Sequence, residues 1–260
     1  MFVRCLAVFC AMFALVLPGR SLLAADPREV FEARVFSGGE GKKLNYRLMR
    51  PQDYDAGKKY PLVLFLHGAG ERGDDNVAQL VHGMADFAKD ENRAKYPCFV
   101  LAPQCPKGQK WSDADWSSDR SELPAKPSEA MQLTLDVIAA LQKEFSIDDH
   151  RLYVTGLSMG GYGTWDLIAR FPERFAAAVP VCGGGDEKQA KRLVRIPIWA
   201  FHGDQDMAVK PIRSRNMIAA IKEAGGEPKY TEYPGVGHDS WVKAYSDPEM
   251  LKWMFAQSRK

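Results

Sequence analysis

Cysteine is scarce in this 260-residue sequence, which contains only five. Cys5 and Cys10 lie in an N-terminal apolar segment, so the remainder holds an odd number of thiols. Within it, Cys98 and Cys105 flank a stretch that is typical of a strand. Seven residues of strand, at ~3.3 Å each, separate two Cα atoms by far more than the ~7 Å limit of a disulfide. We therefore expect buried thiols and no disulfide framework.

The sequence also lacks an apolar run long enough to cross a bilayer comfortably. The N-terminal run covers about thirteen residues, 5–17, where ~20 are usual. Arg4 precedes it and two alanines end at residue 25, which predicts a signal peptide over residues 1–25 and a secreted or periplasmic protein. Leu23 occupies a position where a small residue is preferred, so an uncleaved anchor is the alternative. After cleavage we expect no stable membrane insertion.

Excess charge of one sign is absent as well. Without Arg4 and Arg20 of the signal segment, 33 basic residues balance 33 acidic ones, which argues against a nucleic-acid partner. No metal-binding spacing of histidines or cysteines occurs, and we predict no metal site. No repeat or linker divides the chain, so residues 26–260 predict a single domain.

Apolar runs alternate with helical segments along this domain. Runs typical of strands buried on both faces lie at residues 61–66, 99–102, 152–155, 176–181 and 196–201. Two half-exposed strands precede them at 30–36 and 44–48, and a more polar strand follows at 229–233. Helices are expected over 129–145, over 213–224 and from 248, and Ser128 and Asp247 are predicted to cap the first and the last of them. The alternation predicts an α/β fold: a mostly parallel sheet of about eight strands, entered by an antiparallel hairpin, with helices on both faces.

A glycine-flanked serine lies between one of these strands and a helical segment. Residues 156–160 have the sequence Gly-Leu-Ser-Met-Gly. A nucleophile elbow needs this placement, because its serine occupies a tight strand-to-helix turn that exposes the hydroxyl. The glycines leave room for the backbone. Ser158 is therefore a candidate nucleophile, with a helix-capping serine as the alternative.

Further polar motifs follow neighbouring strands. Residues 67–70 (His-Gly-Ala-Gly) follow the strand at 61–66, residues 202–206 (His-Gly-Asp-Gln-Asp) follow that at 196–201, and His238 follows the last strand. Open α/β sheets bind ligands beyond the carboxyl ends of their strands. A serine, a carboxylate and a histidine thus fall at one edge, in the chain order of α/β hydrolases.

Together these four motifs make residues 40–256 resemble an α/β-hydrolase of the carboxylesterase type. The similar groups are the phospholipase/carboxylesterase, dienelactone-hydrolase-like and polyhydroxyalkanoate-depolymerase-like esterases. The resemblance implies a serine carboxylesterase without a cofactor, with Ser158 as nucleophile and His238 as general base. Asp206 would orient the histidine, with Asp204 as its rival.

The same resemblance implies roles for the surrounding residues. The backbone N–H groups of Ala69 and Met159 would form the oxyanion hole. His67 and His202 would shape the turns after their strands. Four aromatic residues near these motifs are candidates for lining a substrate cleft, or alternatively belong to the core. They are Trp111, Trp116, Tyr162 and Trp241.

The predicted function is a secreted serine hydrolase that cleaves carboxylic esters through an acyl-enzyme. Its partner would be a small-molecule or polysaccharide-linked ester. Two alternatives stay open: a serine peptidase resembling the catalytic domain of prolyl oligopeptidase, and a non-catalytic binding module. The irregular residues 68–96 and 103–126 are long enough to serve function, since structureless loops of that length in a compact domain usually do.

Overall fold

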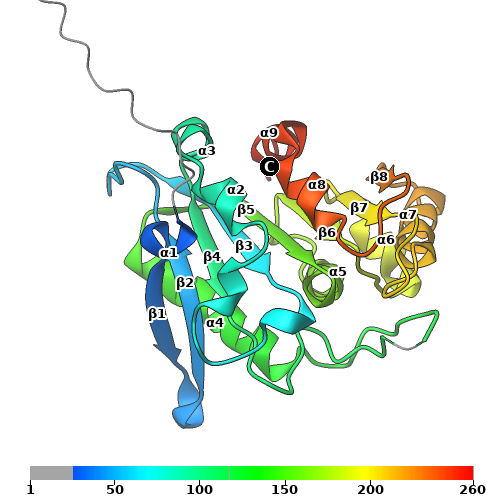
Figure 1. Cartoon of the computed structure of the whole chain (residues 1–260), viewed down its shortest axis with the longest axis horizontal. Coiled ribbons are helices and arrows are strands. Elements are labelled where there is room, and N and C mark those ends of the chain that lie inside the picture. The colour runs from blue at the N-terminus through cyan, green and yellow to red at the C-terminus, as the bar shows by residue number, and fades with distance from the viewer. Residues whose placement is uncertain (1–25, 117, 260) are drawn as a thin grey trace, which may run out of the picture.

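A twisted eight-stranded sheet forms the centre of the computed structural model, which describes residues 26–116 and 118–259 (Figure 1). The signal peptide predicted for residues 1–25 lies outside the described residues. The strands are β1 (Glu32–Ser37), β2 (Lys43–Met49), β3 (Tyr60–Leu66), β4 (Phe99–Pro103), β5 (Ile147–Leu157), β6 (Ala177–Val181), β7 (Trp199–Gly203) and β8 (Lys229–Tyr233). Their order across the sheet is β1-β2-β4-β3-β5-β6-β7-β8.

The strand directions confirm the sequence prediction. β1 pairs with β2, and β2 with β4, in antiparallel fashion, whereas every later pair from β4 to β8 is parallel. The pairing between β6 and β7 is sparse: Val181 is in register with Phe201, and an isolated bridge joins Ala178 to Ile198. This junction lies between the strand of the candidate nucleophile and the strand of the candidate acid.

The helices begin and end close to the expected residues where the sequence shows a clear pattern. They are α1 (Pro27–Val30), α2 (Met84–Ala88), α3 (Asp90–Lys95), α4 (Glu129–Glu144), α5 (Met159–Arg170), α6 (Ala190–Leu193), α7 (Ile212–Glu223), α8 (Trp241–Ser246) and α9 (Pro248–Phe255). The Ser128 hydroxyl accepts the Met131 N–H at 3.2 Å, and the Asp247 carboxylate accepts the Glu249 N–H at 2.9 Å. Both residues therefore cap their helices as the sequence predicts.

Two apolar cores cover the two faces of the sheet. Alternate residues of β3 point to opposite faces, so Leu62 and Leu64 enter one core while Val63 and Phe65 enter the other. The first core contains side chains of α4, α5, α6 and α7, and the second contains side chains of α2, α8 and α9. The prediction of helices on both faces is confirmed.

The irregular segments and the cysteines also follow expectation. Residues 68–96 contain two short 3₁₀ turns, η2 (Ala69–Glu71) and η3 (Ala78–Leu80), before the short helices α2 and α3. Between β4 and α4 the described residues form no helix or strand. Cys98, Cys105 and Cys182 are buried free thiols, which confirms the absence of a disulfide between the first two. Among the described helices, none has the length and apolarity to cross a membrane.

Candidate active site

Ser158 lies on the turn between β5 and α5, with φ +53° and ψ −116°. This left-handed conformation is costly for a residue with a side chain, so the surrounding backbone must enforce it. The flanking glycines make the turn possible. A methyl group on Gly156 would lie 2.5 Å from the carbonyl oxygen of Gly160, and one on Gly160 would clash with the carbonyl oxygen of Leu66. The Ser158 hydroxyl does not cap α5, contrary to the alternative interpretation.

His238 connects Ser158 to Asp206. Its Nε2 lies 2.9 Å from Ser158 Oγ, and its Nδ1 lies 2.7 Å from Asp206 Oδ2. A carboxylate can only accept, so Nδ1 carries the proton and Nε2 is free to accept the serine hydroxyl. The fold thus brings together the three side chains predicted from the sequence, in the geometry of a nucleophile, a base and an orienting acid.

Asp206 is held as a carboxylate although it is almost completely buried. Its Oδ1 accepts the N–H groups of Ala208 and Val209, each at 2.9 Å, and its Oδ2 lies 3.2 Å from His202 Nε2. Burial by itself raises the pKa of Asp206, but the hydrogen bonds from His202, His238 and the backbone outweigh it. The pKa of this carboxyl group therefore lies well below its usual range.

Asp204, the rival acid, has a different position. Its Oδ1 accepts the Gly235 N–H at 2.7 Å and so joins the loop after β7 to the loop after β8. His202 is fully buried, with Nδ1 2.7 Å from Ser214 Oγ and Nε2 2.8 Å from the Val209 carbonyl oxygen. The sequence predicts His202 only as a turn residue, whereas the structure shows that it also contacts Asp206. The spacing of four residues between His202 and Asp206 is the one sequence feature that indicates this contact.

The His67–Gly70 turn lies beside Ser158 on the other side of the site. A methyl group on Gly68 would come within 3.7 Å of Ser158 Cβ. His67 accepts the Cys105 N–H through Nε2 at 2.9 Å and donates through Nδ1 to the Gly68 carbonyl oxygen at 2.6 Å. Burial lowers the pKa of His67 to about 4, which keeps the ring neutral, and the two hydrogen bonds then fix its tautomer.

Two backbone N–H groups are placed near the serine by these turns. Met159 is the first residue of α5, where N–H groups have no acceptor within the helix. The Ala69 N–H belongs to the same peptide unit as the Gly68 carbonyl group that His67 binds. Such a pair of donors is what an oxyanion hole requires.

Trp111 belongs to the core and does not line a cleft, in agreement with the alternative interpretation. It is completely buried, and its Nε1 donates to the His67 carbonyl oxygen at 3.0 Å.

The other three predicted aromatic residues lie on two sides of the site. The Trp241 ring meets the His238 ring edge-on, with centroids 5.3 Å apart. Trp116 stacks on Tyr162 at 5.9 Å, and the Lys110 ammonium lies 4.5 Å from the centre of the Trp116 ring. Tyr162 is itself buried, so Trp116 is the half-buried member of this pair.

Glu71 is a polar residue near the site that sequence reasoning missed. Its Oε1 lies 3.7 Å from His82 Nε2, and its buried Oε2 would lie 2.9 Å from a methyl group on Gly68. The residue directly follows the His-Gly-Ala-Gly motif, but a glutamate in a predicted loop carries no signal of its own. A carboxylate therefore lies beside the turn that carries the Ala69 N–H.

Cys182, Asp206 and His238 are the one group in the described residues with metal-binding geometry, their ligand atoms lying within 4.8 Å of one another. Metal binding needs a thiolate, and burial raises the pKa of the Cys182 thiol far above its usual range. Asp206 and His238 already use the same atoms to bind each other. The arrangement suits proton transfer better than metal coordination.

A serine elbow, a histidine and a carboxylate at the carboxyl edge of a mostly parallel sheet define an α/β-hydrolase of the carboxylesterase type. The chain belongs to the dienelactone hydrolase family, whose model matches residues 90–248. That match spans more than half of the chain and includes Ser158, Asp206 and His238.

Known proteins of similar sequence and structure include esterases. A thermostable esterase of known structure is 43% identical, with a TM-score of 0.82 over 89% of this chain and 64% of that chain. A secreted protein of Arthroderma benhamiae is 26% identical over 82% of the chain, and the bifunctional acetylxylan esterase/xylanase XynS20E of Neocallimastix patriciarum is 29% identical over 56%. The chain spans only 25% and 19% of the length of these two relatives.

Proposed function

We propose that the protein is a secreted serine hydrolase that cleaves carboxylic esters. The observation that carries the proposal is the continuous hydrogen-bonded series Ser158–His238–Asp206, which begins on a strained elbow. Its relation to the thermostable esterase and to an acetylxylan esterase supports an ester as substrate. The secreted relative and the apolar N-terminal segment support export.

Acylation begins when Ser158 Oγ attacks the carbonyl carbon of the ester. The serine proton passes to His238 Nε2, which lies 2.9 Å away, and Asp206 stabilises the imidazolium that forms. The Ala69 and Met159 N–H groups bind the negative oxygen of the tetrahedral intermediate. The bond to the alcohol oxygen then breaks, and that oxygen takes the proton from Nε2 as the alcohol leaves.

Deacylation repeats these steps with water as the nucleophile. Water gives a proton to His238 Nε2 and attacks the acyl carbon, and the same N–H groups bind the second oxyanion. The acyl–Oγ bond breaks, Ser158 recovers its proton from His238, and the carboxylic acid is released. The substrate class that we propose covers small-molecule and polysaccharide-linked esters.

Replacement of the nucleophile tests the proposal. We expect Ser158→Ala to lower kcat for p-nitrophenyl acetate by at least about 10⁴-fold, because the acyl-enzyme cannot form. Ser246→Ala, an exposed serine at the end of α8, is the matched control and keeps full activity. Undiminished turnover in Ser158→Ala with an unchanged circular dichroism spectrum contradicts the proposal.

The two alternative functions, a peptidase and a non-catalytic binding module, predict different results with the same protein. A peptidase would hydrolyse a p-nitroanilide amide at least as well as the matching p-nitrophenyl ester. A non-catalytic binding module would leave Ser158 unlabelled by a fluorophosphonate probe. We expect labelling at Ser158 and a strong preference for the ester.

A further inference from the structure

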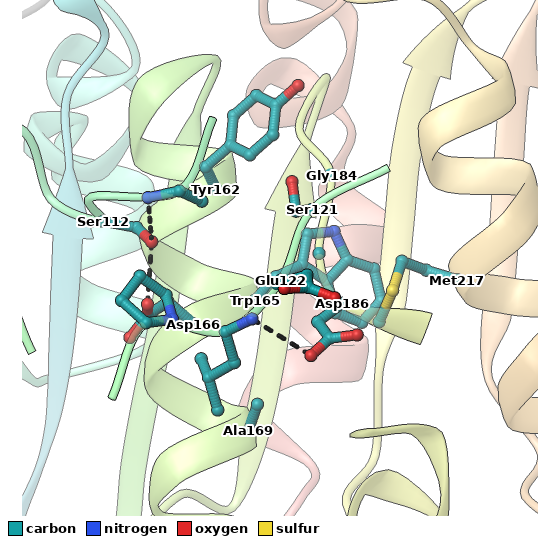
Figure 2. Close-up of a pocket in the computed structure, with 14 residues that line it drawn as sticks. Ser112, Ser121, Glu122, Tyr162, Trp165, Asp166, Ala169, Gly184, Asp186 and Met217 are labelled. Carbon is teal, nitrogen blue, oxygen red and sulfur yellow. Dashed lines mark hydrogen bonds between the residues drawn. The ribbon is translucent and has the colours of Figure 1, made fainter. Parts of the chain in front are cut away.

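The segment between β4 and α4 is fixed by charged side chains of α5, of α7 and of the turn after β6. The Ser112 hydroxyl donates to Asp166 of α5 at 2.7 Å, and the Leu123 N–H donates to Asp186 at 3.0 Å. Figure 2 shows Ser112 and Asp166 joined in this way, with Asp186 on the other side of a small cavity. With about 10 Å³, the cavity has room for a water molecule and none for an ester.

Arg213 of α7 is the most deeply buried of these anchors, with 3% of its surface exposed. Its Nη1 donates to the Ser118 carbonyl oxygen at 2.6 Å and its Nη2 to Ser121 Oγ at 2.5 Å. A third, longer bond reaches the Gly185 carbonyl oxygen at 3.4 Å. The acceptors are thus neutral oxygens from two different loops, which the fork of the guanidinium joins in a fixed geometry.

The anchored residues lie next to the stacked aromatic pair. Ser118 is two residues from Trp116, whose ring stacks on Tyr162, and the Arg213 guanidinium carbon lies 5.7 Å from the centre of the Tyr162 ring. Tyr162 follows Ser158 by four residues, and its N–H binds the Ser158 carbonyl oxygen at 3.0 Å. Burial raises the pKa of Tyr162 and the nearby Asp206 carboxylate adds to the rise, so the aromatic pair lies near the proposed triad.

We propose that Arg213 is a positioning residue for the substrate cleft. By holding residues 118–121 against α7, it keeps Trp116 on Tyr162 and sets how tightly the ester binds. It acts through Trp116 and does not act on the triad. The inference rests on the proposed esterase function, since it assigns the wall of that same site.

A double-mutant cycle measured by steady-state kinetics tests whether Arg213 acts through Trp116. We expect Arg213→Met, which keeps the length of the side chain and removes its donors, to raise KM for p-nitrophenyl butyrate about tenfold with kcat within about twofold. Trp116→Ala should have a similar effect, and adding Arg213→Met to it should change KM by less than about twofold, because coupled residues are not additive. Arg213→Lys, which keeps the charge and some donors, should recover part of the loss.

A loss of kcat at constant KM, or independent effects that multiply in the double variant, overturns the inference. Arg215→Met is the matched control: it lies on the same helix and removes an exposed ion pair with Glu232. If Arg213→Met does not fold, Ser121→Ala takes its place in the cycle, because it removes a single acceptor of the same guanidinium.

Hydrogen exchange gives a readout that needs no turnover. Amides of residues 118–123 should exchange at least about tenfold faster in Arg213→Met or Ser121→Ala, with α5 and the Arg215→Met control unchanged. Unchanged exchange at 118–123 overturns the inference, whatever the kinetics. Faster exchange in a protein that hydrolyses no ester would instead refute the proposed function and leave the anchoring by Arg213 intact.

Discussion

His67 donates a hydrogen bond of 2.6 Å to the carbonyl oxygen of the next residue, Gly68. The N–H on the other end of that peptide unit belongs to Ala69, the proposed oxyanion donor. A hydrogen bond to a carbonyl oxygen polarises its peptide and strengthens the N–H as a donor. We therefore expect the buried His67 to orient and polarise one donor of the proposed oxyanion hole.

The first prediction concerns this histidine. His67→Ala should lower kcat for p-nitrophenyl acetate by about 10- to 100-fold and change KM little, because an oxyanion hole acts on the transition state. Steady-state kinetics measures both constants. His150→Ala, an exposed histidine remote from the site, is the control. A rise in KM with unchanged kcat would show that His67 serves only the shape of the turn.

The second prediction concerns stability in acid. Burial lowers the pKa of His67 to about 4, whereas in the unfolded chain it is ~6.5. Between these values the unfolded chain binds the additional proton, so the folded state loses stability as pH falls through this window. At about 1.4 kcal/mol for each pH unit, the loss approaches ~3 kcal/mol by pH 4. Urea unfolding at several pH values measures the free energy of unfolding of the wild type and of His67→Ala. The variant should lack the part of the pH dependence that His67 contributes.

The third prediction decides between the two candidate acids. Asp206→Asn should reduce kcat by about 10⁴-fold, because the amide cannot hold the same histidine tautomer or stabilise the imidazolium. Asp204→Asn loses only a link between two loops and should retain activity within about tenfold. Kinetics at pH 7 compares the two variants. The opposite order would assign the role to Asp204.

The fourth prediction concerns the elbow. Gly160→Ala should prevent folding or destabilise the protein by more than about 3 kcal/mol, because the methyl group would strike the Leu66 backbone, which cannot move away without disrupting β3. Gly39→Ala adds a methyl group to open space and is the control. Thermal unfolding followed by circular dichroism compares them. Equal melting temperatures would mean that the turn can widen.

The sequence predicts those parts of this molecule that depend on residues close together in the chain. Buried parallel strands such as β3 and β5 need apolar residues on both faces, and the residues after them gather at one edge, so Ser158, Asp206 and His238 were identifiable before the fold. The caps at Ser128 and Asp247 were identifiable for the same reason, since capping depends on neighbours in the chain.

Features that depend on distant contacts were not predictable. The place of β4 between β2 and β3 follows from tertiary packing, and α1 and α6 are too short, at four residues each, to show a helical period. The contact of His202 with Asp206 and the place of Glu71 beside Gly68 arise only when separate turns meet. Arg213 is the first residue of the helix expected over 213–224, and no local pattern indicates that it is buried.

The sparse pairing of β6 with β7 divides the proposed catalytic residues into two groups. Ser158 and both oxyanion donors stand on one side of this junction, and Asp206 and His238 stand on the other. The 2.9 Å bond between serine and histidine therefore spans the weakest part of the sheet ladder. A small separation of the two halves would lengthen this bond and stop proton transfer, so we expect enzymatic activity to respond to any strain at this junction.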